Sequence, residues 1–242
     1  GYPLIISGTL FVDGVTVPED YLINLHSENH ITGFTGGDFR VHEGGQGSSF
    51  TDFTDTRFQL KAGITLNNAQ NASIYQLGMP NDQVLEINDS SVDFEQGCNS
   101  GQIIFNRSIV DIVGDLVSQG ELVFTGECSV LANDTTFATR ISIGSSLYVD
   151  TINEELYFHS QNSHFIGSLG VSMAAPGNVS FVDSLFSDSV GIGGGYPTFT
   201  SCEFGSSFTM SRRNGATVED NLFLGPIRFR NYGTSSDAAP WW

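Results

Sequence analysis

The sequence predicts an all-β protein, a single-stranded right-handed parallel β-helix (β-solenoid) of about ten rungs, each about 18 residues long. Three observations lead to this fold class. A six-residue unit recurs at nearly constant spacing, the apolar runs are short and rich in aromatic and β-branched residues, and Gly, Asn, Asp and Ser interrupt these runs every few residues. Such a period is too short for paired-helix repeats, which need roughly 33 to 47 residues.

The six-residue unit has apolar first and sixth positions, two polar residues, a small or polar fourth position and a variable fifth. Its clearest copies are "FVDSLF" at 181–186, "FTSCEF" at 199–204 and "VEDNLF" at 218–223. A rung cannot bury its own apolar face, so we expect the apolar positions to point inward and to stack on those of neighbouring rungs. Both Phe residues of "FTSCEF" should therefore pack between equivalent apolar residues of the units before and after it.

The fourth position of each unit is expected at a bend of the coil, where small polar side chains form a ladder along the solenoid. Between Thr56 and Asn221, 165 residues divide into nine steps of about 18. Weaker copies of the unit are anchored at Gly37, Ala72, Cys128 and Ser163. The predicted ladder consists of Thr56, Ser90, Ser108, Ser146, Ser184, Cys202 and Asn221.

The handedness of the coil is inferred from the regularity of the repeat. A left-handed solenoid also has about 18 residues per turn, but as three strict hexapeptides with little variation in length. Here the steps vary from 16 to 21 residues, and only one hexapeptide in each period is well marked. Large Phe residues also dominate the inward positions. The sequence therefore favours a right-handed coil, with a left-handed coil as the alternative.

The FxxSxF and FxxCxF units that start at Phe181 and Phe199 resemble those of the pectin-lyase-like β-helix superfamily. This superfamily includes pectinolytic enzymes, bacterial adhesin passengers and phage tailspikes. The resemblance covers roughly residues 31 to 224, which is most of the chain. Because unrelated functions share this fold, the resemblance implies an architecture and leaves the activity open.

Both terminal segments depart from the repeat, and the ends of a solenoid need caps because each exposes a sheet edge. Residues 1–30 are predicted to form an N-terminal capping or attachment element, in which Asp13-Gly14 between two alternating runs indicates a hairpin. Residues 31–224 are predicted to form the parallel β-helix, and residues 225–242 a C-terminal cap or tail.

The C-terminal segment carries both tryptophans of the sequence and two of its eight arginines. Trp and Arg are frequent anchors at protein interfaces. The interface candidates are Arg228, Arg230, Trp241 and Trp242. Two interpretations stay open, because the tail could fold over the last rung or contact another subunit or partner.

The charge and composition exclude several classes of partner. With 27 acidic residues against eight Arg and the single Lys61, we expect no nucleic-acid partner, because phosphate binding needs clusters of Lys and Arg. No window of 18 apolar residues occurs, so no membrane insertion is expected. The first residues lack the basic region that opens a signal peptide. Cys98, Cys128 and Cys202 lack metal-ligand spacing and are expected to be small buried residues.

No motif identifies a catalytic site, and the only named candidates, Asp93 and Asp111, are weak. They are 18 residues apart, so they could occupy equivalent positions on adjacent rungs, which lie about 4.8 Å apart. Glycoside hydrolysis uses two carboxylates separated by roughly 5 to 10 Å. With 27 acidic residues in the chain, however, chance alone produces such pairs. His159 and His164 lie within the segment "FHSQNSHF" and are expected to be solvated surface residues.

No cofactor and no metal site is predicted from the sequence. Stacked carboxylates can bind calcium, which takes oxygen ligands. The sequence has neither a DxDxDG loop nor a GGxGxD repeat, so no residues can be assigned to such a site.

From the resemblance, the acidity, the scarcity of Lys and the non-repeating ends, we expect a structural virion surface protein of a tailed phage. It would be a tailspike, fibre or head-decoration module that mediates host-surface or glycan attachment, or particle assembly. The resemblance implies a homo-oligomer, with a trimer favoured, whose partners are other virion proteins and cell-surface polysaccharide. Its expected location is the virion surface or the extracellular space. The alternatives are a polysaccharide-degrading lyase or hydrolase and a bacterial surface adhesin or extracellular filament subunit, and we favour a protein without enzymatic activity.

Overall fold

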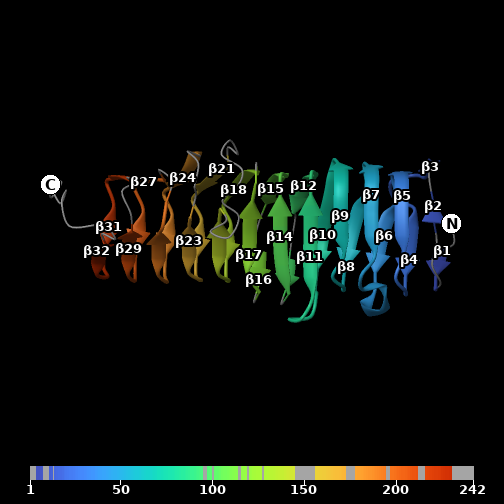
Figure 1. Ribbon diagram of the computed structural model, residues 1–242, viewed down its shortest axis with the longest axis horizontal. Helices are drawn as coiled ribbons and strands as arrows, with labels where there is room; N and C mark the ends of the chain where they lie inside the picture. The colour runs from blue at the N-terminus through green and yellow to red at the C-terminus, as the bar shows by residue number, and fades with distance from the viewer. Residues whose placement is uncertain are drawn as a thin grey trace.

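A computed structural model shows a rod of short parallel strands stacked along one axis (Figure 1). Strand β1 lies at one end of the rod, and β31 and β32 lie at the other. The structure describes residues 4–7, 11–12, 14–94, 97–99, 101–113, 116–118, 120–126, 128–144, 156–172, 178–194, 197–211 and 216–230.

The strands of the described residues form three sheets, in which every pair of neighbouring strands is parallel. Sheet A has 12 strands, in the order β1 (Leu4–Ile6), β4 (Leu22–Leu25), β6 (Asp38–Val41), β8 (Arg57–Leu60), β10 (Ala72–Leu77), β12 (Ser91–Phe94), β15 (Ile109–Val113), β18 (Ser129–Asn133), β21 (Tyr157–Gln161), β24 (Asn178–Val182), β27 (Thr198–Thr200) and β30 (Thr217–Glu219).

Sheet B has 13 strands and sheet C has seven. Sheet B contains β2 (Phe11–Val12), β5 (His30–Thr35), β7 (Ser49–Thr54), β9 (Thr65–Gln70), β11 (Val84–Asn88), β14 (Gln102–Asn106), β17 (Leu122–Thr125), β20 (Ile141–Ile143), β23 (Leu169–Val171), β26 (Val190–Ile192), β29 (Phe208–Ser211) and β32 (Ile227–Arg230), with β3 (Val15–Thr16) also paired to β5. Sheet C contains β13 (Gly97–Asn99), β16 (Leu116–Ser118), β19 (Thr136–Phe137), β22 (His164–Phe165), β25 (Leu185–Phe186), β28 (Glu203–Phe204) and β31 (Leu222–Phe223).

Helix is almost absent from the described residues, where one short 3-10 helix, η1, spans Glu43–Gly45. No helix in that part of the chain is long and apolar enough to cross a membrane. The predicted fold class, an all-β parallel β-solenoid of about ten turns, is confirmed.

The core follows from the alternation of side chains along each strand, which points every second residue inward. In β6, for example, Phe39 and Val41 are buried, whereas Asp38 and Arg40 are partly exposed. Inward residues of successive turns pack on one another, so that the buried apolar side chains form one continuous cluster along the rod. Offset and edge-to-face ring pairs add about 0.5–1.5 kcal/mol each beyond burial.

The stacking predicted for "FTSCEF" is confirmed. Phe199 stacks on Phe181 with ring centroids 4.9 Å apart, and it is the Cα partner of Val218 in the next turn. Phe204 lies between Phe186 and Phe223, at centroid distances of 4.9 and 4.7 Å.

The turns are less uniform than the sequence period indicates. Along sheet A, the Cα partners lie 16 residues apart for Ile23 and Phe39 and 21 apart for Phe158 and Val179. Between Val130 and its partner Phe158 the turn takes 28 residues. This long turn changes where the repeated unit falls on the coil.

The predicted ladder exists as two ladders at different corners. The first follows sheet B and precedes sheet A, and it contains Thr56, Ser90, Ser108 and Cys128. The backbone N–H of Ser90 donates to Ser108 Oγ at 3.2 Å, and Ser108 Oγ donates to the carbonyl of Asn106 at 2.9 Å. The Cys128 thiol contacts the backbone of Ser108 and donates to the carbonyl of Thr125 at 2.9 Å.

The second ladder lies between sheet A and sheet C. It contains Ser184, Cys202 and Asn221 from the predicted set, preceded by Thr135 and Ser163. The N–H of Ser163 donates to Ser184 Oγ at 3.3 Å, and the N–H of Cys202 donates to Asn221 Oδ1 at 2.7 Å. Ser146 lies outside the described residues.

The prediction of a single ladder was wrong because both corners have the same local chemistry. At each, a residue with positive φ, such as Asp89 (51°) or Asp183 (49°), is followed by a small polar residue that satisfies backbone groups of the bend. The sequence period divides the 35 residues from Cys128 to Ser163 into two repeats, which the structure does not show. These 35 residues consist of the seven residues to Thr135, across β18, and one 28-residue turn.

The hairpin predicted at Asp13-Gly14 is also wrong. Strands β2 and β3 flank this position, and each pairs in parallel with β5 instead of with the other. The short apolar runs near the N-terminus are therefore strands of the coil. Sheets A and B extend from β1 and β2 to β30 and β32, so strands of the solenoid lie on both sides of the expected limits 31 and 224. A capping role for residues 1–30 or 225–242 stays a prediction.

Candidate functional site

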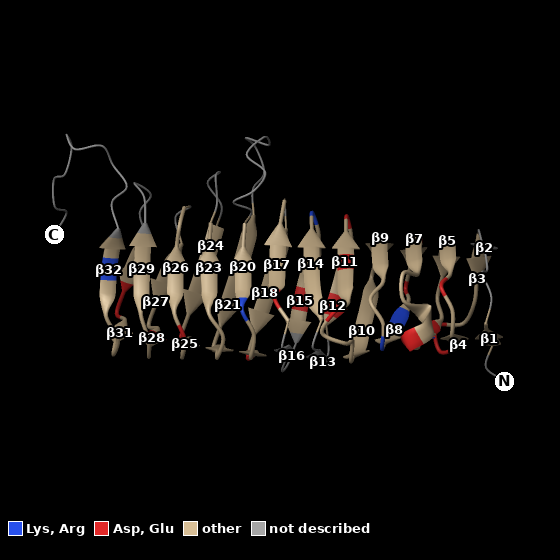
Figure 2. Cartoon of the chain, turned by 60° about the horizontal axis from the view of Figure 1, so that its bottom comes forward, with Lys and Arg blue, Asp and Glu red and all other residues tan. Residues whose placement is uncertain are grey.

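The outward face of sheet A brings the two candidate carboxylates together. Asp93 in β12 and Asp111 in β15 are Cα partners, and the residues that flank them, such as Val92 and Val110, are buried. Both aspartates therefore point outward from adjacent strands, which lie about 4.8 Å apart. Acidic positions of neighbouring turns are visible along this part of the rod in Figure 2. The expectation that the two residues occupy equivalent positions is confirmed.

Strand register places these carboxylates in one outward column. From the N-terminal side, the column contains Asp38, Arg57, Ser73, Asp93, Asp111, Leu131, His159, Ser180 and Thr198. Such a column presents hydroxyl, carboxylate and imidazole groups at a regular spacing. Carboxylates accept hydrogen bonds, and hydroxyl groups both donate and accept them.

Exposed apolar side chains lie beside the carboxylates on the same face. Ile109 is 62% exposed and Tyr157 is 42% exposed, and both are aligned with Ser129, which lies between them. Leu131 is also exposed, and it lies in the carboxylate column itself, between Asp111 and His159. A tyrosine ring offers an apolar surface for stacking and a hydroxyl for hydrogen bonding. Apolar groups exposed together often mark a binding surface.

The sequence prediction missed Tyr157, Ile109 and Leu131. A signal for them was available, because each lies out of phase with the inward residues of its strand. In β18, for example, Val130 and Ala132 are buried, so Leu131 between them has to face outward. An apolar residue at an outward position could have been identified once the phase of the strand was known.

The two histidines of "FHSQNSHF" belong to different sheets. His159 lies in β21 of sheet A, and its Nδ1 is 2.7 Å from Ser180 Oγ in the next strand. His164 lies in β22 of sheet C, where its Nε2 is 2.7 Å from Ser187 Oγ. Both are partly exposed, and they do not converge on one site.

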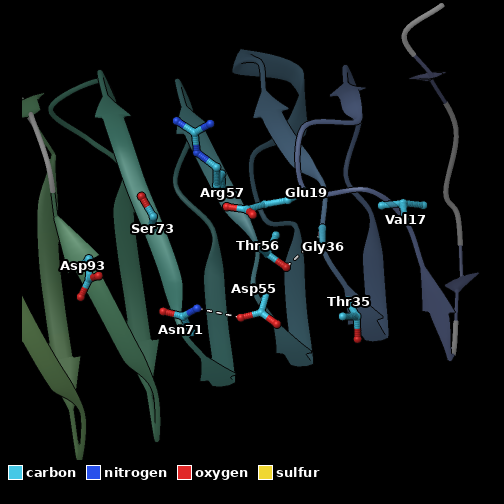
Figure 3. A pocket seen from close by; sticks show the side chains of 10 residues that line it. All are labelled: Val17, Glu19, Thr35, Gly36, Asp55, Thr56, Arg57, Asn71, Ser73 and Asp93. Carbon is cyan, nitrogen blue, oxygen red and sulfur yellow. Dashed lines mark hydrogen bonds between the residues drawn. The ribbon is translucent and has the colours of Figure 1, made fainter. Parts of the chain in front are cut away.

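A shallow polar hollow adjoins the carboxylate pair on the N-terminal side (Figure 3). Its lining includes Glu19, Asp55, Arg57, Asn71, Ser73 and Asp93. Asn71 Nδ2 donates to Asp55 Oδ1 at 2.7 Å. The Arg57 guanidinium lies over the ring of Tyr75, 4.8 Å from its centroid. Asp93 therefore belongs both to the hollow and to the carboxylate pair.

The hydroxyl of Tyr75 is held beneath Arg57. It donates to Asp38 Oδ1 at 2.8 Å. Desolvation and this hydrogen bond raise the pKa of Tyr75, so the phenol stays protonated. Asp38, Tyr75 and Arg57 thereby hold one another in place at the edge of the hollow.

A second hollow lies at the other border of sheet A. It is lined by Asn133, Asp134, Gln161, Asn162 and Asp183. Asn162 Nδ2 donates to Asp134 Oδ1 at 2.5 Å. Strands β18 and β21 thus carry Leu131, His159 and Tyr157 on their outward face and amide and carboxylate groups at their ends.

The remaining candidates are placed as follows. Arg228 is exposed on β32, Arg230 ends that strand, and Trp241 and Trp242 lie outside the described residues. Cys128 and Cys202 are buried free thiols. The described residues contain no group of three or more His, Cys, Asp or Glu arranged to hold a metal ion.

Comparison with protein-family models, with curated proteins and with solved structures found no match for this chain.

Proposed function

We propose that the protein is a structural component of a virion surface, a tailspike, fibre or head-decoration module of a tailed phage, that attaches to a cell-surface glycan. The observation that carries the proposal is the outward face of sheet A, where Ile109 is exposed on the same strand as Asp111, the partner of Asp93, and Tyr157 is exposed two strands further along the sheet. Glycans present apolar ring faces and many hydroxyl groups. An aromatic ring on the same face as carboxylates, with amides at the strand ends, matches that chemistry.

The solenoid also suits a rod that holds a binding face away from a particle. Its three sheets extend along the same axis. The buried Phe stacks and the two ladders join successive turns. The resemblance of the FxxSxF units to pectin-lyase-like β-helices, which include phage tailspikes, supports the same assignment. Within this proposal the protein is a homo-oligomer, with a trimer favoured, that leaves sheet A accessible and binds other virion proteins.

Glycan-array binding tests the attachment role. The wild-type protein is expected to bind a subset of surface polysaccharides, and Tyr157→Ala is expected to lose most of that binding because the stacking surface is removed. Ile166→Ala is the matched control, since Ile166 is exposed but follows β22 of sheet C. Equal binding by wild type and Tyr157→Ala would contradict the assignment of the binding face. Light scattering of the purified protein tests the trimer.

A polysaccharide-degrading enzyme is the second candidate, and the pairing of Asp93 with Asp111 favours it. Adjacent carboxylates on an open face are compatible with the acid and base of a glycoside hydrolase. This alternative predicts shortened polysaccharide after incubation, and abolished cleavage in Asp93→Asn and Asp111→Asn. Binding without shortening of the polysaccharide would leave the attachment role.

Immunogold labelling of phage particles and of bacteria distinguishes a virion protein from a bacterial adhesin or filament subunit.

A further inference from the structure

The C-terminal end of the rod exposes apolar residues at positions that point into the core in the preceding turns. Strands β30, β31 and β32 are the last strands of sheets A, C and B. Their inward positions hold Val218, Phe223, Ile227 and Phe229, which we name the C-terminal end face. Their Cα partners in the preceding turn are Phe199, Phe204, Phe208 and Met210.

Burial changes abruptly between these two turns. Phe199 and Phe208 are 0% and 2% exposed, whereas their partners Val218 and Ile227 are 37% and 45% exposed. Phe229, the partner of Met210, is 74% exposed. One side of Phe223 stacks on Phe204 at 4.7 Å, so its other side belongs to the end face. An apolar surface of this kind, bordered by unpaired strand edges, is one that proteins cover.

Residues 231–242 are the part of the sequence best suited to cover it. They follow β32 directly, and their sequence, "NYGTSSDAAPWW", joins a polar spacer to both tryptophans of the chain. From Arg230 to Trp241 an extended chain spans at most about 36 Å. That reach exceeds the width of a coil whose sheets pack roughly 10 Å apart. Because this segment is tethered at the end face, its effective concentration there is far above that of a separate molecule.

We propose that residues 231–242 fold back across the C-terminal end face and that Trp241 and Trp242 pack on Ile227 and Phe229. This inference goes beyond the attachment role. Of the two interpretations that the sequence left open, it favours the tail folded over the last rung over a contact with another subunit, and it names the surface that the two tryptophans cover. It also accounts for two large aromatic residues after a spacer of mostly small and polar residues.

Intrinsic fluorescence tests the proposal directly, because Trp241 and Trp242 are the only tryptophans and report only on this segment. In the native full-length protein, the emission maximum should lie to the blue of its position in guanidinium, and acrylamide should quench it less. The blue shift should not change on dilution. Phe229→Ser should move the emission toward the red, since it removes an apolar contact from the end face.

Ile109→Ser is the matched control, because Ile109 is similarly exposed but lies on sheet A in the middle of the rod. Its emission should equal that of the wild type. Far-UV circular dichroism verifies that both variants stay folded, as expected for substitutions at exposed positions. Native emission at the unfolded wavelength would overturn the proposal. So would a blue shift that is lost on dilution, which would show that a second copy covers the end face, or a blue shift that Phe229→Ser leaves unchanged.

Discussion

The ring of Phe204 stacks on the ring of Phe186 in the preceding turn, with centroids 4.9 Å apart and planes inclined by 7°. Phe204 is also buried against Phe223 of the following turn. Phe204→Ala should therefore leave a cavity in a continuous column and lower the free energy of unfolding by about 3–5 kcal/mol. Denaturant unfolding measures this change. Leu222→Ala, at a neighbouring exposed position, should change it by less than about 0.5 kcal/mol. Equal stabilities of the two variants would argue against the stacked core.

The hydrogen bonds of the ladders yield a second prediction. Ser108→Ala leaves the buried N–H of Ser90 without its side-chain acceptor, so the loss should be about 1–3 kcal/mol. Ser108→Cys should lose less, because the thiol of Cys128 already occupies an equivalent position in the same ladder. Ser129→Ala, an outward change in β18, is the control. The ladder would be refuted if Ser108→Ala were as stable as that control.

Stability near the N-terminal end of the rod should depend on pH. His26 and His42 stack with ring centroids 4.0 Å apart, and burial, His26, Lys61 and Arg40 lower the pKa of His42 below its ordinary 6.5. A lowered folded-state pKa means that the unfolded chain binds the proton more tightly. The contribution of His42 to the free energy of unfolding is therefore complete above pH 6.5. It is lost as the pH falls through the lowered pKa of the folded state.

The pH prediction is checked by thermal unfolding of wild type and His42→Gln between about pH 7 and pH 5. The wild type should lose stability relative to the variant toward the acid end, because glutamine does not titrate. An NMR titration of His42 should give a midpoint below 6.5. A constant difference between the two proteins across this range would contradict the prediction.

The buried thiols should be unreactive in the folded protein. Burial raises the pKa of Cys128 and of Cys202, and hydrogen bonds from backbone groups offset this only in part. Since the thiolate is the reactive form, alkylation by iodoacetamide at pH 8 should be much slower in the native protein than in guanidinium. Mass-spectrometric peptide mapping distinguishes these residues from Cys98. Equal rates in the native and unfolded protein would show that the two thiols do not lie in the ladders as described.

The repeating part of the fold could be predicted from the sequence because it depends on side-chain alternation and stacking. The partners of Phe199 and Phe204 were expected correctly, as was the shared register of Asp93 and Asp111. In each case, residues about one period apart occupy the same place on neighbouring turns. Spacing alone is sufficient to predict the partners of a residue where the turn length stays close to that period.

Spacing failed where two different corners satisfy the same local rule. A residue with positive φ followed by a small polar residue occurs at Asp89-Ser90 before sheet A and at Asp183-Ser184 before sheet C. Only the 28-residue turn between Val130 and Phe158 separates the two series. The exposed face at Tyr157 was missed for the same reason, because the outward residues of β21 can be identified only once the repeated units are assigned to the right corner.

Binding of a glycan to the outward face of sheet A can be observed directly. The most direct measurement is a crystal structure of the protein with an oligosaccharide selected from the glycan array. We expect electron density for one sugar ring against Tyr157 and for further sugar residues that extend along the sheet toward Asp111 and Asp93. Density confined to sheet B, to sheet C or to a subunit junction, with none on sheet A, would contradict it.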